Sequence, residues 1–303
     1  MSRASSIIAD WIAVDWGTTN LRAYAMGPGD TVLAEGSSDD GMGRLDPDGF
    51  EPALLRVIGD WLGEGVTQVL ACGMVGARQG WVEAPYRETP CAMTAAAPIA
   101  APTKDPRLAV QILPGVSQNR PADVMRGEET QVAGALHLSP GFDGVVCLPG
   151  THTKWIHVSA GEIVSFQTAM TGEMFALLAT QSVLRHSVAG DALDIDAFDE
   201  AVSVTLSRPE RLAQTLFGIR ADGLLHGQSD AVSRARLSGL LIGAELAATK
   251  PYWLGQAVML GGAAPLVALY RRALAAQGAE ATAHDARTLT LAGLCLARKS
   301  LLQ

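Results

Sequence analysis

The sequence has few aromatic residues and few cysteines, and it has no long uncharged hydrophobic run. Aromatic side chains make up 5% of the 303 residues, so we expect a core of Ala, Leu and Gly in which helices pack closely on sheets. The four cysteines lie far apart and form no CxxC pair, which is typical of reduced thiols. No stretch reaches the roughly 18 apolar residues that a membrane span needs. The sequence therefore predicts a cytoplasmic protein without a membrane partner.

Several common catalytic motifs are also missing. There is no GxxxxGK[ST] loop, no GxGxxG that opens a helix and no GxSxG elbow, so P-loop, dinucleotide-binding and serine hydrolase classes are not indicated. The six histidines show no HExxH or similar spacing, which argues against a zinc site held by the protein. A net charge of -8 argues against nucleic acid as the main partner.

The order of the expected elements predicts a mixed α/β protein with two domains. Extended runs at residues 11–14, 21–26, 31–35 and 66–72 surround a helical pattern near residues 54–62. The pattern restarts near Pro121 with a helix in "RGEETQVAGALHL" and three strands in "GVVCLPGTHTKWIHVSAGEIVSF". Helical patterns then dominate residues 174–248, and a final helix is expected over 285–302. We therefore expect domains at residues 1–115 and 116–303.

Two bends rich in Gly and Thr join strands, one in each half of the chain. "VDWGTTNLR" and "LPGTHTKW" both read as strand, bend and strand, and their glycines lie in the first hairpin of each expected domain. Backbone N–H groups and hydroxyls on such a bend can bind phosphate oxygens, although plain hairpin turns use the same residues. The predicted phosphate-binding residues are Gly17, Thr18, Thr19, Asn20, Gly150, Thr151 and Thr153. Lys154 either contacts phosphate or is a solvated lysine of the hairpin.

A third segment, "QAVMLGGAAPLVALY", places a strand, a tight turn of small residues and a helix in succession. Gly261, Gly262 and Ala263 would let a flat ring lie on the backbone near a helix N-terminus. A close-packed turn between strand and helix explains the same pattern, so the adenosine-binding role depends on the other two segments.

In this order, the three segments resemble the phosphate-one, phosphate-two and adenosine loops of the actin–hexokinase–chaperone ATPase superfamily. Further segments, "ACGMVGARQGWVEAPY", "MRGEETQVAGAL" and "TAMTGEMFALL", make the chain similar to the 2-dehydro-3-deoxygalactonokinase family over nearly its whole length. The resemblance implies a two-domain actin/hexokinase-like (ribonuclease H-like) fold, with a five-stranded type of mixed sheet flanked by helices in each domain and a cleft between them. It also implies ATP- and Mg²⁺-dependent phosphorylation of the 6-hydroxyl of 2-dehydro-3-deoxy-D-galactonate.

The resemblance assigns roles to the acidic residues. Asp15, at the end of the first strand, is expected to hold Mg²⁺ through its water shell, unless it only caps the turn. Related kinases carry a general base in a Gly-Asp-Gln type of motif, and here "GEETQ" occupies that place. Glu128 is the preferred base because it directly follows the glycine, and Glu129 is the alternative. Both acids could instead only offset the helix dipole.

A sugar acid needs cations and hydrogen-bond donors, and arginine suits a carboxylate best. The substrate-binding candidates are Arg22, Met74, Arg78, Gln79, Trp81, Tyr86 and Arg126. Phosphorylation of a neutral hexose or of the gluconate epimer, and a non-catalytic nucleotide-binding regulatory module, are the alternative functions. A homodimer is compatible with the sequence, which fixes no assembly.

Overall fold

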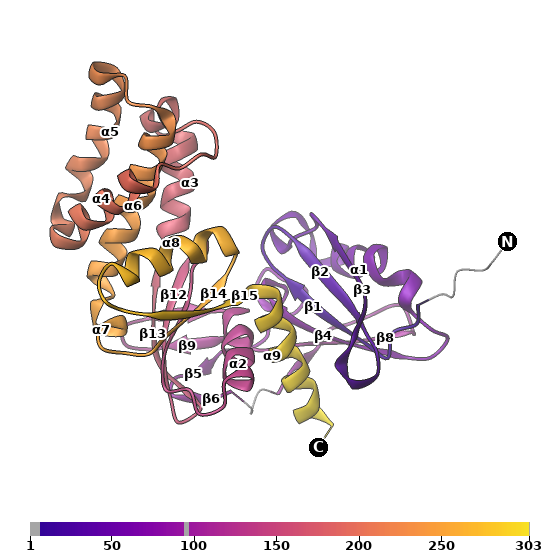
Figure 1. Ribbon diagram of the computed structural model, residues 1–303. Coiled ribbons are helices and arrows are strands. Elements are labelled where there is room, and N and C mark those ends of the chain that lie inside the picture. The colour runs from indigo at the N-terminus through magenta and orange to yellow at the C-terminus, as the bar shows by residue number, and fades with distance from the viewer. Residues whose placement is uncertain (1–6, 94–96, 303) are drawn as a thin grey trace. The chain divides into compact units, whose positions relative to one another are not determined.

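The computed structural model describes residues 7–93 and 97–302, and its chain divides into two compact units. Unit 1 consists of the described parts of residues 1–142, 159–165 and 286–303 (Figure 1). Unit 2 consists of Asp143–Val158 and Phe166–Asp285. This division by contacts is not the expected division after residue 115, because it groups residues 116–142 and the C-terminal helix with the first unit. The division into domains at residues 1–115 and 116–303 stays a prediction.

Unit 1 is built on a mixed sheet in the order β3-β2-β1-β4-β8-β7. The hairpin of β1 and β2 is antiparallel, and β4 and β8 continue the sheet in parallel with β1. The strands are β1 (Trp11–Trp16), β2 (Leu21–Met26), β3 (Val32–Ser38), β4 (Thr67–Gly73), β7 (Ile99–Ala100) and β8 (Leu108–Ile112). The sheet has six strands where five were expected, because the two-residue strand β7 pairs with β8 at the edge.

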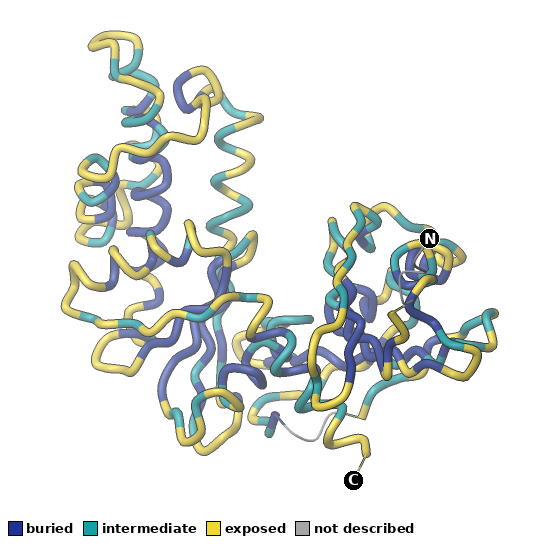
Figure 2. Tube along the Cα trace, turned by 45° about the vertical axis from the view of Figure 1, so that its right-hand side comes forward, coloured by how far each residue is buried: buried dark blue, intermediate teal, exposed yellow. Residues whose placement is uncertain are grey.

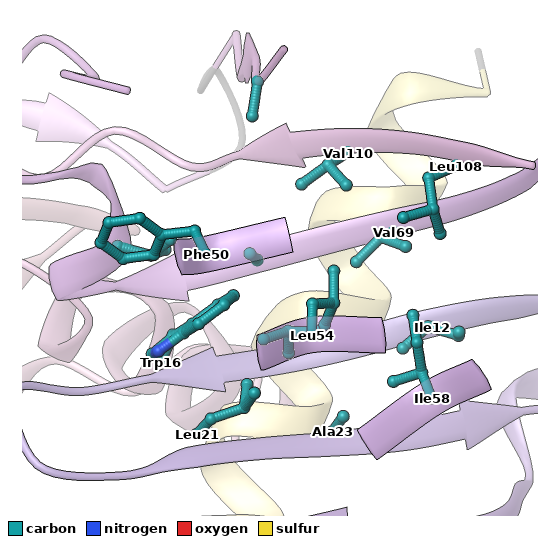
Figure 3. Close-up of a cluster of buried hydrophobic side chains, with 14 of the residues drawn as sticks. Ile12, Trp16, Leu21, Ala23, Phe50, Leu54, Ile58, Val69, Leu108 and Val110 are labelled. Carbon is teal, nitrogen blue, oxygen red and sulfur yellow. The ribbon is translucent and has the colours of Figure 1, made fainter. Parts of the chain in front are cut away.

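Alternate residues of β1 contribute to two different cores, as the period of two in a strand requires. Ile12, Val14 and Trp16 pack on the face covered by helix α1 (Phe50–Ile58). In Figure 3 the side chains of Leu54 and Ile58 lie over the β1–β2 hairpin, and the rings of Trp16 and Phe50 are 5.4 Å apart. Burial of these side chains fixes the direction of β1 and therefore the place where its C-terminal end emerges.

The opposite face of this sheet is covered from the far end of the chain. Trp11 and Ala13 pack there with Leu294 of helix α9 (Ala286–Leu301). Helix α2 (Glu128–Leu138) packs against α9, and the two labels lie side by side in Figure 1. A Cβ atom at Gly134 would lie 1.9 Å from the Leu289 carbonyl oxygen, and one at Gly293 would lie 1.9 Å from the Thr130 carbonyl oxygen. These glycines therefore set the distance between the helices.

Unit 2 contains the strands β15-β14-β11-β12 and the later part of β13, in that order. β14 lies parallel to both β11 and β15, whereas β11 and β12 form an antiparallel hairpin. The bounds are β11 (Gly144–Leu148), β12 (Thr153–Ser159), β13 (Glu162–Ala169), β14 (Val258–Gly262) and β15 (Ala281–Asp285). The first residues of β13 belong to unit 1, where Ile163 pairs with Cys91 of β6 (Cys91–Ala92).

Helices make up most of the rest of unit 2. They are α3 (Thr171–Gln181), α4 (Ile195–Ser207), α5 (Leu212–His226), α6 (Asp230–Ala248), α7 (Lys250–Trp253) and α8 (Ala264–Ala275). Helix α6 packs against α4, and its middle is buried, whereas α5 exposes much of its surface (Figure 2). Glycine in the left-handed conformation at Gly227 ends α5 after His226.

The remaining elements are short. A small sheet in unit 1 has the order β10-β9-β5, with β5 (Arg87–Glu88), β9 (Val116–Gln118) and β10 (Asp123–Met125). The 3₁₀ turns are Pro28–Asp30, Met42–Arg44, Pro47–Gly49, Gly59–Trp61, Met74–Gly76, Val183–His186 and Pro209–Arg211. Within the described ranges, no helix combines the length and apolar character that crossing a membrane requires.

Candidate functional site

Asp15 is the last residue but one of β1 and lies two residues before the Gly-Thr-Thr-Asn bend. Its side chain is about a quarter exposed, at 27%, and burial raises the pKa of its carboxyl group, while Arg22 opposes that shift. Arg22 lies opposite Asp15 on β2, with 3.6 Å between Nη1 and Oδ2. This separation is longer than a hydrogen bond, so the carboxylate remains able to accept from another donor.

The bend at residues 17–20 is closed by one backbone bond and leaves its tip exposed. The Gly17 N–H donates to the Asn20 carbonyl at 2.9 Å, and Thr18 and Thr19 are exposed. Met42 and Gly43 support the bend from behind by donating to the carbonyls of Gly17 and Thr18. Consequently the Thr18 hydroxyl is accessible to a ligand, and the Thr19 hydroxyl, which accepts from the Asn20 side-chain amide at 2.9 Å, can still donate to one.

This support depends on Gly41, which the sequence analysis did not identify. A Cβ atom at Gly41 would lie 2.2–2.4 Å from backbone atoms of Thr18 and Thr19. Only glycine allows so close an approach, and the "DDGMG" pattern after β3 was the signal for it.

The start of α2 lies against the end of β4, next to Asp15. Asp15 is paired with Cys72 in the parallel register of β1 and β4, and a Cβ atom at Gly127 would lie 3.2 Å from the Gly73 Cα atom. Burial raises the pKa of the Cys72 thiol strongly, and the charges of Asp15 and Glu129 add to that increase. Unit 1 therefore holds both Asp15 and the acids of α2, which the sequence analysis had divided between two domains. The catalytic roles of these three acids stay predictions.

The two acids of α2 have different surroundings. Glu129 is 4% exposed, and both of its oxygens accept from the Gly127 N–H, at 2.9 and 2.7 Å. Burial, and then the charge of Glu128, raises the pKa of Glu129 to about 7. Glu128 is partly exposed, and its Oε2 atom accepts from the Arg126 N–H at 2.9 Å. Glu128 is thus the more accessible carboxylate, whereas Glu129 is buried and has a raised pKa.

The three candidate arginines differ in their partners. Arg78 is exposed and lies 3.5 Å from a carboxylate oxygen of Glu83, while Arg22 faces Asp15. Arg126 is 7% exposed, stacks 4.2 Å from the centre of the Tyr86 ring and donates from Nη2 to the Ala84 carbonyl. Its Nε and Nη1 atoms are buried without a hydrogen-bond partner among the described residues.

The other substrate candidates lie on the segment that follows β4. Met74 is partly buried and Gln79 is exposed. Trp81 packs against Trp16 and stacks on Phe50 in the core of unit 1, and its indole N–H donates to the Pro102 carbonyl. Tyr86 is 43% exposed and forms a surface beside Arg126.

In unit 2, the second bend begins with accessible residues and is followed by buried ones. Gly150 is partly exposed and Thr151 is exposed. Thr153 is fully buried, and its hydroxyl lies 3.0 Å from the Tyr270 hydroxyl. Lys154 is 5% exposed, and its Nζ atom donates to the Thr168 hydroxyl at 2.7 Å, so the alternative of a solvated lysine is wrong. Phosphate binding by Thr153 and Lys154 stays a prediction.

A cavity of about 440 Å³ lies beside this bend, entirely within unit 2. Its walls are mainly apolar side chains of α3, α6 and α8, and Arg234 stacks on Phe175 at 4.9 Å. The lining residues include Gly150, Thr151, Thr171, Gly172, Phe175, Arg234, Ser238, Leu241, Ile242, Pro265, Leu266, Leu269 and Tyr270. Such a cavity suits a flat aromatic ring with a polar group directed toward the bend.

The third predicted segment adjoins the second. Gly261 and Gly262 end β14 and are buried, Ala263 precedes α8, and the next residues of α8 line the cavity. A Cβ atom at Gly262 would lie 3.1 Å from the Pro149 carbonyl oxygen. Thus the second phosphate bend lines the cavity, and the predicted adenosine residues lie directly before the part of α8 that lines it.

Sequence analysis missed the contribution of α3 to this cavity. A Cβ atom at Gly172 would lie 2.2 Å from the Gly150 carbonyl oxygen, and the Glu173 N–H donates to the Thr151 carbonyl at 2.9 Å. The "TGE" at the start of a helix was a local signal, since glycine at a helix start permits close approach of another backbone.

Comparison with known proteins decides the family. A family model described as 2-keto-3-deoxy-galactonokinase matches residues 15–297. The chain is 41% identical over 298 residues to a probable 2-dehydro-3-deoxygalactonokinase of Rhizobium meliloti (strain 1021), covering 96% of this chain and 97% of the relative. It is 37% identical over 289 residues to the 2-dehydro-3-deoxygalactonokinase of Escherichia coli (strain K12), covering 94% and 96%. The chain belongs to the 2-keto-3-deoxy-galactonokinase family.

Solved structures agree with this membership. The crystal structure of a putative 2-dehydro-3-deoxygalactonokinase from Sinorhizobium meliloti matches with a TM-score of 0.89 and 40% identity, covering 96% of this chain and 99% of that one. A dehydratase activator from Clostridium difficile with bound ADPNP matches at 12% identity with a TM-score of 0.51, which shows the fold alone. The expected actin/hexokinase-like fold and the family resemblance are confirmed. This sugar kinase is a phosphotransferase with an alcohol group as acceptor, and a kinase of this fold uses ATP.

Proposed function

We propose that this kinase transfers the terminal phosphoryl group of ATP to the 6-hydroxyl of 2-dehydro-3-deoxy-D-galactonate, giving the 6-phosphate and ADP. The observation that carries the proposal is the placement of Asp15 and the acids of α2 at the adjoining ends of β1 and β4. Phosphoryl transfer requires a positioned acceptor, a proton acceptor and neutralisation of phosphate charge, and this end of the sheet offers groups for each task.

Glu128 is proposed as the general base because it is the accessible acid of the pair. The 6-hydroxyl oxygen attacks the terminal phosphorus while its proton passes to the Glu128 carboxylate, and the bond to the bridging oxygen of ADP breaks. The exposed hydroxyls of Thr18 and Thr19 would donate to phosphate oxygens in unit 1. In unit 2, Gly150 and Thr151 are the accessible members of the second bend.

Magnesium is proposed as the metal of the reaction, where it would offset the charge of the phosphate oxygens. Within the described part of the chain, no group of three or more His, Cys, Asp or Glu side chains could hold a metal ion. A partly exposed single carboxylate such as Asp15 fits Mg²⁺, because this ion keeps several waters and takes other ligands from phosphates. Asp15 would therefore bind it through water.

Arg126 is proposed to pair with the carboxylate of the sugar acid. Arg22 and Arg78 already face protein carboxylates, whereas the Nε and Nη1 atoms of Arg126 are buried without a partner among the described residues. A buried guanidinium without a counter-charge is unfavourable, and a substrate carboxylate would supply one. Because Tyr86 and Ala84 cover the guanidinium, the segment after β4 would shift when the acid binds.

An ADP-release assay on a panel of acceptors tests this function. The panel contains the galactonate-derived acid, its gluconate-derived epimer, and neutral hexoses, and the product of the best acceptor is checked for a 6-phosphate. We expect the acids to be preferred by the parent enzyme, and Arg126→Met to lose that preference more than Arg78→Met. Phosphorylation of a neutral hexose in preference to both acids would contradict the proposal.

The assembly and location of the kinase remain predictions. A homodimer is proposed as its assembly in solution, and sedimentation velocity would test it. Helix α5 exposes Phe217, Leu224 and Leu225 by 65%, 66% and 76%. Exposed apolar surface of this kind is a candidate for the contact between two copies of the chain.

A further inference from the structure

A buried carboxylate lies behind the cavity of unit 2, and no part of the proposed mechanism uses it. Glu245 of α6 is 5% exposed. Its Oε1 atom accepts from the Trp155 indole N–H at 2.7 Å, and its Oε2 atom accepts from the Tyr270 hydroxyl at 2.8 Å. The side chains of Thr153 and Thr171 also hydrogen-bond to this carboxyl group.

Trp155 and Tyr270 donate to different oxygens of the carboxyl group, so neither oxygen is left buried without a partner. Burial raises the pKa of Glu245, and the hydrogen bonds from Thr171, Trp155, Tyr270 and Thr153 reduce that increase without reversing it. The network therefore satisfies a buried carboxyl group in the interior of unit 2.

The four side chains that interact with Glu245 come from three elements beside the cavity. Thr153 and Trp155 lie on β12, directly after the second bend, and Thr171 begins α3. Tyr270 lies on α8, which follows the predicted adenosine segment. Thr171 and Tyr270 themselves line the cavity, together with Gly150 and Thr151 of the bend. One side chain thus connects the bend, the start of α3 and α8.

We propose that Glu245 is a positioning residue for nucleotide binding, which holds β12, α3 and α8 so that the bend and the start of α3 face the ligand together. The inference rests on the proposed function in so far as the ligand of this cavity is ATP. Thr171 both lines the cavity and hydrogen-bonds to Glu245, so the carboxyl group would hold the Thr171 hydroxyl in the cavity wall. A ribose hydroxyl is the kind of ligand group that a hydroxyl held in this way would bind.

Glu245→Gln tests this role, because the amide has the shape of the carboxylate but replaces an acceptor oxygen by a donor. Trp155 or Tyr270 then loses its acceptor, because each donates to a different oxygen of Glu245. We expect the Kd for ADP, measured by isothermal titration calorimetry, and the KM for ATP to rise by about tenfold or more. The KM for the sugar acid should stay within about twofold. Tyr270→Phe removes a single donor and should raise the Kd for ADP by less, in the same direction.

Thr205→Val is the matched control. Thr205 is equally buried in unit 2 and donates to the Leu240 carbonyl at 2.7 Å, on the face of α6 that packs against α4. It should lower the melting temperature without changing the Kd for ADP. If Glu245→Gln does not fold, the Kd for ADP of Tyr270→Phe alone tests the positioning role.

The outcomes separate the two proposals. If the parent binds ADP and both Glu245→Gln and Tyr270→Phe bind it equally well, the positioning role is wrong and the proposed function stands. If Thr205→Val weakens ADP binding as much as Glu245→Gln, the effect is general loss of stability and the positioning role is again wrong. If the parent binds no ADP, both proposals are wrong.

Discussion

At the scale of single residues, the two adjacent acids of α2 allow a direct comparison. Glu128 is partly exposed, while Glu129 is buried and bonded twice to the Gly127 N–H. We expect Glu128→Gln to lower turnover by about 10²–10⁴-fold, since a positioned base contributes that much. Glu129→Gln should have a milder effect, and ATP affinity should change little in either variant. Near-parental turnover in both variants would place the base elsewhere.

Glu129 also gives a prediction for stability against pH. Its pKa is raised to about 7 in the folded chain, above the ordinary glutamate value, so the folded state holds this proton more tightly than the unfolded state. Stability is therefore expected to fall as pH rises from about 4.5 to about 7, by on the order of 3 kcal/mol from this group alone. Denaturant melts of the parent and Glu129→Gln across pH 5–8 should show a flatter profile for the variant. Parallel profiles would show that Glu129 is not perturbed.

Asp15 should matter for turnover and much less for folding. Asp15→Asn removes the charge that would hold the water shell of Mg²⁺, and it also relieves the burial of a carboxylate. Turnover should fall by more than about a hundredfold, as loss of a single electrostatic group in an active site does. The melting temperature without ligand should not fall. Turnover within about threefold of the parent would indicate that Asp15 only caps the turn.

At the scale of elements, α2 and α9 pack so closely that two glycines between them leave no room for a side chain. Gly134→Ala or Gly293→Ala would place a methyl group 1.9 Å from a carbonyl oxygen of the opposite helix. Each should lower the free energy of unfolding by about 1–3 kcal/mol, because the helices must separate. Gly218→Ala on α5 is the control, since its Cβ atom would meet nothing nearer than 3.9 Å. That variant should gain up to about 1 kcal/mol in urea melts.

Local patterns predicted most elements and failed where partners are distant in sequence. Both strand–bend–strand segments, the helix at Glu128 and the strand and helix around Gly262 are confirmed. The sequence did not indicate that Thr153 and Lys154 are enclosed, because β12 is covered on both faces and the Thr153 hydroxyl contacts a residue 117 positions later. Likewise, which arginines already face carboxylates depends on pairs such as Asp15 and Arg22 across a hairpin register.

Local sequence patterns could not predict the unit boundaries, for the same reason. The sequence order suggests one domain after another, whereas α9 at the end of the chain packs with β1 at its beginning. Hydrophobic periodicity shows that α9 has a buried face, but not which sheet covers that face.

At the scale of the whole molecule, closure over both ligands stays a prediction. The predicted phosphate-binding residues belong to two compact units, so binding of one nucleotide by both sets would involve both units. We expect the radius of gyration from small-angle X-ray scattering to decrease when a non-hydrolysable ATP analogue and the sugar acid are both added. An unchanged radius at saturating ligand would contradict closure. The analogue alone serves as the control for a partial change.

The return of α9 to the first sheet has a consequence for synthesis of the chain. The ribosome synthesises β1 and β4 long before Ala286–Leu301. The face of the unit 1 sheet that α9 covers is therefore exposed while unit 2 is translated. Trp11 and Leu70, which lie in the same core as Leu294, would remain in contact with water or with a chaperone during that time. Unit 2 has its full set of strands and helices earlier, by Asp285. The part of the kinase that begins the chain is therefore the part that finishes folding last.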